Sequence, residues 1–148
     1  MSVKRIVALF ICIILILSLC YCGDVSRVQV IDVPSQLYTQ EDIRAAIEVI
    51  KSDFAQGWDH CTLLNIRYAG DEFMTEPYSN GSGSEFETWS KLYDADEAII
   101  LYSDFYVSPA AENDFENTLA VDTTYENWKW ELVRDKGGQW RHVDHGYC

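Results

Sequence analysis

The chain begins with a segment organised for a membrane, and this restricts the folded domain to the residues that follow. Lys4 and Arg5 stand just before an uninterrupted apolar run over residues 6–17. A short basic start followed by such a run is typical of an export signal. Residues 6–22 carry no charge, and these 17 residues reach only the lower edge of the length that spans a bilayer, about 17 to 25 residues. We therefore predict a cleaved leader over residues 1–22 in preference to a permanent membrane anchor.

The two basic residues also predict the side of the membrane on which the domain lies. Lys and Arg are enriched on the cytoplasmic flank of membrane segments, so Lys4 and Arg5 are expected to stay inside. The C-terminal part is then delivered to the extracytoplasmic side whether or not the leader is cleaved. We predict a location at the cell membrane with the domain outside, or secretion if no anchor remains.

The end of the leader resembles the lipobox of bacterial lipoproteins, in which a Leu lies three residues before a Cys that receives diacylglycerol. In Leu19-Cys20-Tyr21-Cys22, the matching pair is Leu19 and Cys22. Tyr21 departs from the pattern, which has a small residue just before the Cys. The resemblance implies that Cys22 is the lipid attachment site and that acyl chains such as palmitate hold the N-terminus in membrane lipid. The alternative is that Cys12, Cys20 and Cys22 are apolar residues of a leader or anchor helix.

The remaining residues are strongly acidic and fit a single domain. The 148-residue chain has 24 acidic and 11 basic residues and a formal net charge of -13. Nucleic-acid binding requires clustered Lys and Arg to displace counterions from phosphates, so this balance excludes nucleic acid as a partner. A chain of this length holds one ordinary domain. We assign residues 23–37 to an extended lead-in and residues 38–148 to the domain.

A long amphipathic helix is the clearest element of the domain. Thr39 precedes Asp42 by three positions, which is the spacing of a cap in which a hydroxyl and a carboxylate satisfy the first turn. Gly57 provides a suitable end. Between them, residues at spacings of three and four form one apolar face: Ile43, Ala46, Ile47, Ile50 and Phe54. This face is expected to pack on a sheet.

Alternating and β-branched residues predict the strands of that sheet. The predicted strands are residues 61–68, 97–107, 128–134 and 139–143, the last two joined by a turn over residues 135–138. A second, short helix is expected from Ser84 to Tyr93, because Ser84 and Glu87 repeat the capping pattern. Residues 71–83 and 108–117 are predicted loops. Together these elements predict an α+β fold, with one long helix packed on a mainly antiparallel sheet of about four strands.

The chain from Tyr38 to Tyr147 resembles a family of small uncharacterised lipoproteins from Gram-positive bacteria. The resemblance rests on six segments: Tyr38–Ile43, Cys61–Leu63, Asp96–Leu101, Trp128–Arg134, Gly137-Gly138 and Gly146-Tyr147. The family is similar in element order to cystatin-like domains of the nuclear-transport-factor-two type, in which a cone-shaped sheet wraps a helix. The resemblance implies this fold and an extracytoplasmic address, and it brings no assigned activity.

A few residues near the C-terminus and at the first predicted long strand are candidates for special chemistry. Cys61 and Cys148 could form a disulfide outside the cytoplasm, or Cys61 could be a buried thiol and Cys148 an exposed one. His142, His145 and Cys148 are spaced by three, which is a weak metal-ligand pattern. Positions three apart on a strand point to opposite faces, so only a bend after Val143 would join the two His side chains. Solvated polar residues at the chain end are the favoured interpretation, and we predict neither a metal nor a cofactor.

The sequence contains no nucleophile elbow, phosphate-binding loop or zinc-protease pattern. The favoured hypothesis is a non-catalytic domain that binds a protein or ligand partner near the membrane. The alternative is an enzyme or small-ligand binder with a pocket between helix and sheet, whose wall would include Tyr102, Asp104, Trp128, Trp130 or His142. A deep cavity with convergent polar groups would favour the alternative, and a filled apolar core would favour the first hypothesis.

Overall fold

The long helix forms where the capping pattern predicts it. The computed structural model describes residues 22–114 and 118–147, and in it α2 spans Gln40–Gly57. The Thr39 hydroxyl accepts a hydrogen bond from the backbone N–H of Asp42 at 3.1 Å, and the Asp42 carboxylate accepts one from the N–H of Thr39 at 3.1 Å. Two amides at the start of the helix are thereby satisfied. The apolar residues predicted to share one face are all buried, which confirms that face.

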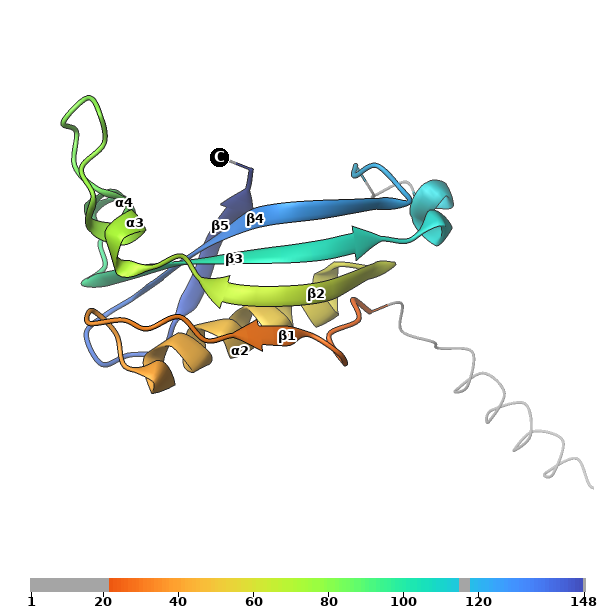
Figure 1. The fold of residues 1–148 in the computed structure, drawn as a ribbon, viewed down its shortest axis with the longest axis horizontal. Helices are drawn as coiled ribbons and strands as arrows, with labels where there is room; N and C mark the ends of the chain where they lie inside the picture. The colour runs from red at the N-terminus through yellow and green to blue at the C-terminus, as the bar shows by residue number, and fades with distance from the viewer. Residues whose placement is uncertain (1–21, 115–117, 148) are drawn as a thin grey trace, which may run out of the picture.

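This helix packs across one face of a strongly curved mixed sheet (Figure 1). The described residues form five strands in the spatial order β1-β2-β3-β4-β5. Their bounds are β1 (Gln29–Ile31), β2 (Cys61–Tyr68), β3 (Glu97–Val107), β4 (Thr123–Arg134) and β5 (Arg141–Gly146). β1 pairs with β2 in parallel, and the remaining pairings are antiparallel. The long strand β3 therefore lies in the middle, with a short parallel strand at one edge.

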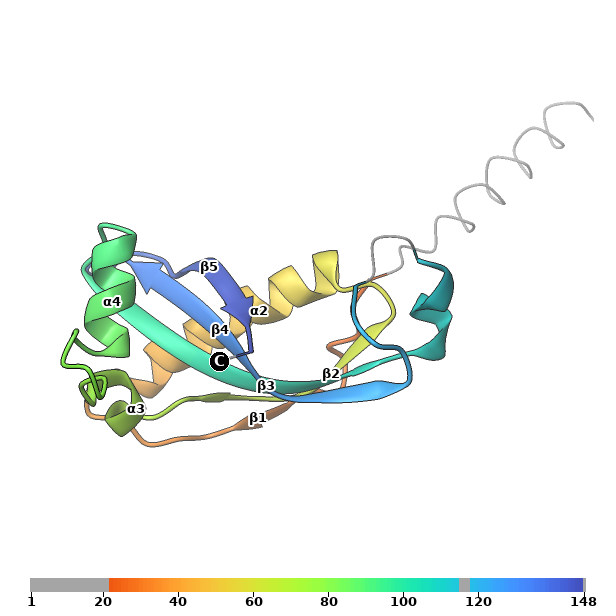
Figure 2. The same ribbon diagram turned by 90° about the horizontal axis from the view of Figure 1, so that it is seen from above.

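Irregularities beside Asp104 bend the sheet around the helix (Figure 2). The register shifts next to this residue in the pairing of β3 with β2 and again in its pairing with β4. The Asp104 carboxylate accepts hydrogen bonds from the Asn65 side chain at 2.7 Å and from the backbone N–H of Asn127 at 2.8 Å. Asn127 has a φ of 56°, which Asn adopts more readily than most residues. Because bulges raise the local twist and bend strands, these contacts stabilise the curvature.

The core lies between α2 and the concave face of the sheet. Phe54 is fully buried, and its ring contacts Phe105 and Trp130 edge-on, with centroids 5.9 and 6.3 Å apart. The indole N–H of the buried Trp130 donates to the Ser103 hydroxyl at 2.8 Å. The polar group of Trp130 therefore has a partner inside the core, as buried hydrogen-bonding groups usually do, whereas the indole N–H of Trp128 makes no hydrogen bond to the described residues.

The opposite face of the sheet is covered at one end by α4 (Glu85–Leu92), which lies next to α3 (Asp71–Thr75) (Figure 1). Lys129 of β4 points toward α4, with its ammonium 3.9 Å from Glu85 and 2.9 Å from Glu131. Burial raises the pKa of the Glu131 carboxyl, and Lys129 opposes that shift. These contacts fasten α4 to β4. The short 3-10 helix η1 (Pro109–Asn113) lies at the other end of the molecule.

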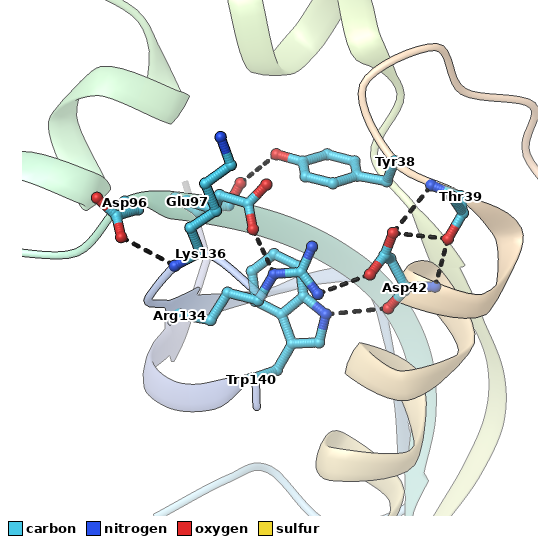
Figure 3. Close-up of polar contacts among 9 residues, drawn as sticks. Tyr38, Thr39, Asp42, Asp96, Glu97, Arg134, Lys136 and Trp140 are labelled. Carbon is cyan, nitrogen blue, oxygen red and sulfur yellow. Dashed lines mark hydrogen bonds and ion pairs between the residues drawn. The ribbon is translucent and has the colours of Figure 1, made fainter. Parts of the chain in front are cut away.

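A second group of ion pairs fastens the first turn of α2 to the sheet (Figure 3). Arg134, at the end of β4, contacts Asp42 at 2.6 Å and Glu97 of β3 at 2.5 Å. Its guanidinium lies over the Trp140 ring, 4.1 Å from the centroid, and the Trp140 indole N–H donates to the Asp42 carbonyl at 3.0 Å. The Tyr38 hydroxyl donates to a backbone carbonyl of β3 beside them. Residues far apart in the chain are thus joined at one end of the helix.

The structure confirms the α+β class and corrects its details. The sheet has five strands rather than about four, because the lead-in contributes β1 as a parallel edge strand. The described residues contain three α-helices, since α3 forms inside the predicted loop over residues 71–83. Asp71, at the start of α3, accepts hydrogen bonds from the Ser35 hydroxyl at 2.5 Å and from the Tyr68 hydroxyl at 3.0 Å. β4 also begins at Thr123, before the predicted start at residue 128.

Candidate functional site

Aromatic side chains gather on the concave face, near the end of α2. We call them the aromatic cluster, which consists of Trp58, Phe105, Tyr125, Trp128, Trp130, His142, His145 and Tyr147. Neighbouring rings have centroids 5.1 to 6.1 Å apart. The alternation of β4 explains part of the cluster, because residues two apart on a strand share a face. The remaining members come from the segment after α2, from β3 and from the C-terminal part of the chain.

Trp58 is placed by the end of α2. Its backbone N–H donates to the Phe54 carbonyl at 3.1 Å, and its ring stacks on the Phe54 ring with centroids 5.4 Å apart. The indole meets Trp128 at 82° with centroids 5.7 Å apart, and it meets His145 at 65° and 5.2 Å. Trp58 is therefore steeply inclined to both other rings and forms a corner with them, while Trp128 and His145 are inclined to each other by 34°.

A pocket opens beside this corner. Its volume is about 490 Å³, and its walls include Trp58, Trp128 and His145. Asp59 and Asp114 add carboxylates to the lining. This volume lies within the range of about 300 to 1,000 Å³ that is common for ligand pockets, and the lining exposes more polar than apolar surface. The lining residues within the described ranges include neither Lys nor Arg, so the pocket favours neutral or cationic groups over anions.

Other hollows on the surface are less convincing as sites, and two of them are larger than this pocket. One beside α4, of about 840 Å³, is lined only by Ser82 and by residues of α4 itself, so it is the flank of a single helix. The other, of about 560 Å³, lies between α2 and the turn that joins β4 to β5. Its walls include Arg134 and Trp140, which are already engaged in the ion-pair network. The pocket beside the aromatic corner differs from both in having three rings from separate elements and two carboxylates in its lining.

The two histidines proposed as weak metal candidates lie on the same face of β5. A register shift in the pairing of β4 with β5 leaves Val143 as an extra residue. An extra residue of this kind bends the strand, and the bend brings the His142 and His145 side chains to the same face. The ring centroids of His142 and His145 are 5.3 Å apart. His142 places Nδ1 2.9 Å from the Asp53 carboxylate and Nε2 3.1 Å from the Asp144 carbonyl. Because both partners are acceptors, His142 satisfies them together only with a proton on each nitrogen.

His145 has a different environment. Partial burial and the neighbouring His142 lower its pKa, so its ring is neutral at neutral pH and brings no positive charge to the pocket. Within residues 22–114 and 118–147, no group of three or more His, Cys, Asp or Glu side chains is arranged to hold a metal ion. The histidine pair therefore acts in this structure as part of the aromatic wall.

The cysteines predicted to carry chemistry lie in different environments. Cys61 is a buried thiol at the start of β2, and it lines the pocket. Burial, reinforced by the nearby Asp59 carboxylate, raises the pKa of this thiol to about 11. A nucleophilic thiolate is therefore scarce at neutral pH. Cys148 lies outside the described residues, so its disulfide with Cys61 stays a prediction. Cys22, the predicted lipid attachment site, is exposed at the start of the described chain.

The residues predicted to line a pocket between helix and sheet divide into two groups. Trp128 lines the pocket, and Trp130 and His142 belong to the aromatic cluster behind it. Tyr102 and Asp104 alternate along β3 with residues of the concave face, so they lie on the opposite face of the sheet. Of the five residues predicted for the wall, Trp128 lines this pocket, and the alternative of an enzyme or small-ligand binder stays a prediction.

Trp58 and Asp59 are the wall residues that sequence reasoning missed. Both lie directly after Gly57, where the helix was expected to end. A residue just past a helix end can turn back over the core, but the direction of its side chain depends on the strand that follows. The available signal was therefore their position after the helix, which indicates a corner of the fold and not a ligand site.

The described start of the chain lies beside the C-terminal end of α2 and the start of β2 (Figure 1). Gly23 packs so closely on α2 that an added Cβ would lie 2.3 Å from the Phe54 carbonyl oxygen. The backbone N–H of Asp24 donates to the Cys61 carbonyl at 2.8 Å. Cys22 is therefore joined to the folded domain without a linker, beside a residue that lines the pocket.

The predicted leader, apart from its last residue, lies outside the described residues. Within the part of the chain that the structure describes, no helix has the length and apolar character needed to cross a bilayer. No protein-family model, curated protein or solved structure matches this chain. The fold and site define an acidic α+β domain with an aromatic-walled pocket, and its function is argued from that geometry.

Proposed function

We propose that this chain is a non-catalytic binding domain held at the extracytoplasmic face of the cell membrane, with the aromatic-walled pocket as its ligand site. The observation that carries the proposal is the pocket itself, where rings from three elements meet two carboxylates around about 490 Å³. Small-molecule sites combine aromatic side chains with polar groups that fix the orientation of the ligand, and both kinds of group line this pocket. The sequence hypothesis of a binding domain is thereby combined with the pocket that its alternative required.

The groups beside the pocket favour binding over catalysis. His142 has both ring nitrogens engaged, one with Asp53 and one with a backbone carbonyl. Burial keeps the Cys61 thiol protonated at neutral pH. His145 is neutral, but no described side chain hydrogen-bonds to its ring, so it lacks the orienting partner that catalytic bases commonly have.

The proposal includes a cystatin-like architecture for the domain. A long helix lies in the concave face of a bent, mainly antiparallel sheet (Figure 2), which supports this assignment. The bulges beside Asp104 supply the bend. The aromatic corner lies on the concave side of this sheet, where the chain leaves α2 at Trp58.

The address is the second part of the proposal: the leader directs export and Cys22 carries the lipid. Two features of the domain support it. Cys22 is exposed, and Gly23 and Asp24 join the fold directly after it. An acyl group on Cys22 would therefore hold the pocket end of the domain close to the membrane surface.

Metabolic labelling tests the lipid. Cells grown with an alkyne fatty acid are expected to label the wild-type chain and not the Cys22→Ala variant, because only a thiol at the acylation site accepts diacylglycerol. Cys20→Ala is the matched control and should keep the label. Label that survives Cys22→Ala, or a wild-type chain without label, contradicts the proposed attachment.

Filling the pocket from its edge tests the ligand site. Gly57 lines the pocket, and a Cβ at this position would meet no atom within 4 Å. Gly57→Leu is expected to fold and to be as stable as the wild type or up to about 1 kcal/mol more stable, since leucine loses less backbone entropy in a helix. Native mass spectrometry of protein extracted from its own membrane should show a small molecule retained by the wild type and lost from Gly57→Leu.

Gln56→Leu is the control for that experiment, because it adds the same side chain at a neighbouring exposed position outside the pocket. It should retain the molecule as the wild type does. Equal retention by Gly57→Leu, or a wild-type protein that carries no molecule, would count against the pocket as a binding site.

A further inference from the structure

We infer that the ligand of the aromatic-walled pocket carries an organic cation of the trimethylammonium type. The inference rests on the proposed function of the pocket and names the chemical class that it binds. A free small molecule and the headgroup of a lipid can both present this group. The ring geometry, the charge of the lining and the position of the pocket each support it.

The corner of rings suits a rounded, weakly hydrated cation. Aromatic rings attract cations through their negative faces, and methylated ammonium groups are bound by such sets of rings. Trp58 is inclined at 82° to Trp128 and at 65° to His145, so one rounded group at the corner can contact more than one ring. A flat sugar ring would instead lie parallel to a single broad indole face.

The charge of the lining favours a cation over its neutral isostere. Asp59 lines the pocket, and its carboxylate makes no hydrogen bond or ion pair with the described residues. Its negative charge is felt at the pocket wall, because it contributes to the raised pKa of Cys61, another lining residue. His142, next to His145 in the aromatic cluster, already has the Asp53 carboxylate as a partner at 2.9 Å. The whole chain carries a net charge of -13, which attracts cations from solution.

The position of the pocket makes both sources of the cation accessible. Cys22 leads directly into Asp24, whose backbone pairs with the pocket residue Cys61. A domain held at Cys22 therefore has its pocket near the headgroup layer. A dissolved cation reaches the same pocket from the aqueous side.

Calorimetric titration with choline and with 3,3-dimethylbutan-1-ol, its uncharged isostere, separates charge from shape. The full-length protein is kept in a polyoxyethylene detergent, which contains neither choline nor sugar. Choline is expected to bind at least about tenfold more tightly than the alcohol, in line with the strength of a desolvated cation–π contact. Equal binding of the two compounds, or binding of glucose in preference to choline, would overturn the inference.

Matched variants locate the binding. Asp59→Asn should weaken choline binding several-fold and leave binding of the alcohol unchanged, because it removes charge and keeps the shape of the side chain. Glu76→Gln makes the same change in charge on an exposed residue beside α3, at the other end of the molecule, and should bind choline as the wild type does. An equal effect of the two variants would show a general charge effect and would contradict a site at Asp59.

Vesicles distinguish the two sources of the cation. If a lipid headgroup supplies it, the domain should bind phosphatidylcholine vesicles more tightly than phosphatidylglycerol vesicles, and free choline should compete. If choline binds and the vesicles show no such difference, a free cation is the ligand. If choline fails to bind while an uncharged molecule is retained by the wild type and lost from Gly57→Leu, the cation inference fails and the binding function stands. If no molecule is bound in either experiment, both fail.

Discussion

Replacing Arg134 by methionine is expected to lower the free energy of unfolding by about 3 to 5 kcal/mol, the usual cost of removing one member of a buried ion-pair group. The Arg134 side chain is only 10% exposed and contacts Asp42 at 2.6 Å and Glu97 at 2.5 Å (Figure 3). Methionine has a comparable volume but leaves both carboxylates without their cation, and it removes the guanidinium from the Trp140 ring. Urea unfolding, monitored by tryptophan fluorescence, measures this loss. The comparison requires that the free energy of unfolding decrease with urea concentration at the same slope in both proteins.

Two controls separate the charge of Arg134 from its shape. Arg134→Lys keeps the charge but loses the planar fork that serves two carboxylates at once, so it should cost less than methionine. Hydrogen bonds from Thr39 and Arg134 lower the pKa of Asp42. Since the folded pKa lies below the unfolded value, the stabilisation from Asp42 is present above pH about 4 and is lost as the pH falls through the folded pKa. The methionine variant should show a weaker loss in acid.

A loss below about 1 kcal/mol in the methionine variant would contradict this account, because it is the value expected for exposed ion pairs. The first turn of α2 would then be held by the Thr39 cap and by apolar packing alone.

Replacing Trp130 by alanine is expected to cost about 3 to 5 kcal/mol, because it empties a large volume in a core that cannot fully collapse. Trp130 is fully buried and contacts Phe54 and Trp58, with centroids 6.3 and 5.1 Å apart. Its indole N–H also donates to Ser103 at 2.8 Å. Chemical denaturation measures the change, and near-ultraviolet circular dichroism reports whether the aromatic cluster keeps its order.

Trp130→Phe is the matched control, because it keeps an aromatic ring in the core and removes the hydrogen bond to Ser103. It should cost less than alanine and should preserve choline binding, since Trp130 supports the pocket wall from behind. Equal destabilisation by phenylalanine and alanine would mean that the hydrogen bond, and not the volume of the ring, is the main contribution of this residue.

Local sequence patterns predicted the elements whose formation depends on near neighbours. The cap at Thr39 and Asp42, the buried face of α2 and the strand over residues 61–68 all follow from residues close together in the chain. The turn between β4 and β5 likewise has its glycines in place. These elements need no distant partner to be recognised.

Features that depend on distant partners were not predictable. The helix α3 begins at Asp71, whose hydrogen-bond partners include the Ser35 side chain, 36 positions away in the chain. The bend at Asp104 depends on Asn65 and Asn127 from neighbouring strands. The residues next to Asp71 and Asp104 in the sequence do not indicate which distant residues pair with them. One feature of this kind was stated as a condition: His142 and His145 could meet only if the strand bends after Val143. In the structure Val143 is the extra residue in β5, and the two ring centroids lie 5.3 Å apart.

The pocket shows the same division between local and distant information. Trp128 was named as a wall residue because the alternation of β4 placed it on the inner face. Trp58 and Asp59 entered the wall only through the direction in which the chain leaves α2. A ligand site assembled from the ends of several elements is therefore harder to predict than the elements themselves.

The most direct measurement of the central claim is a crystal structure of the full-length protein purified from its own membrane without added ligand. We expect density for an organic molecule in the corner formed by Trp58, Trp128 and His145, with its charged group facing Asp59. A pocket that contains only ordered water, with the retained molecule bound elsewhere on the domain, would contradict the account.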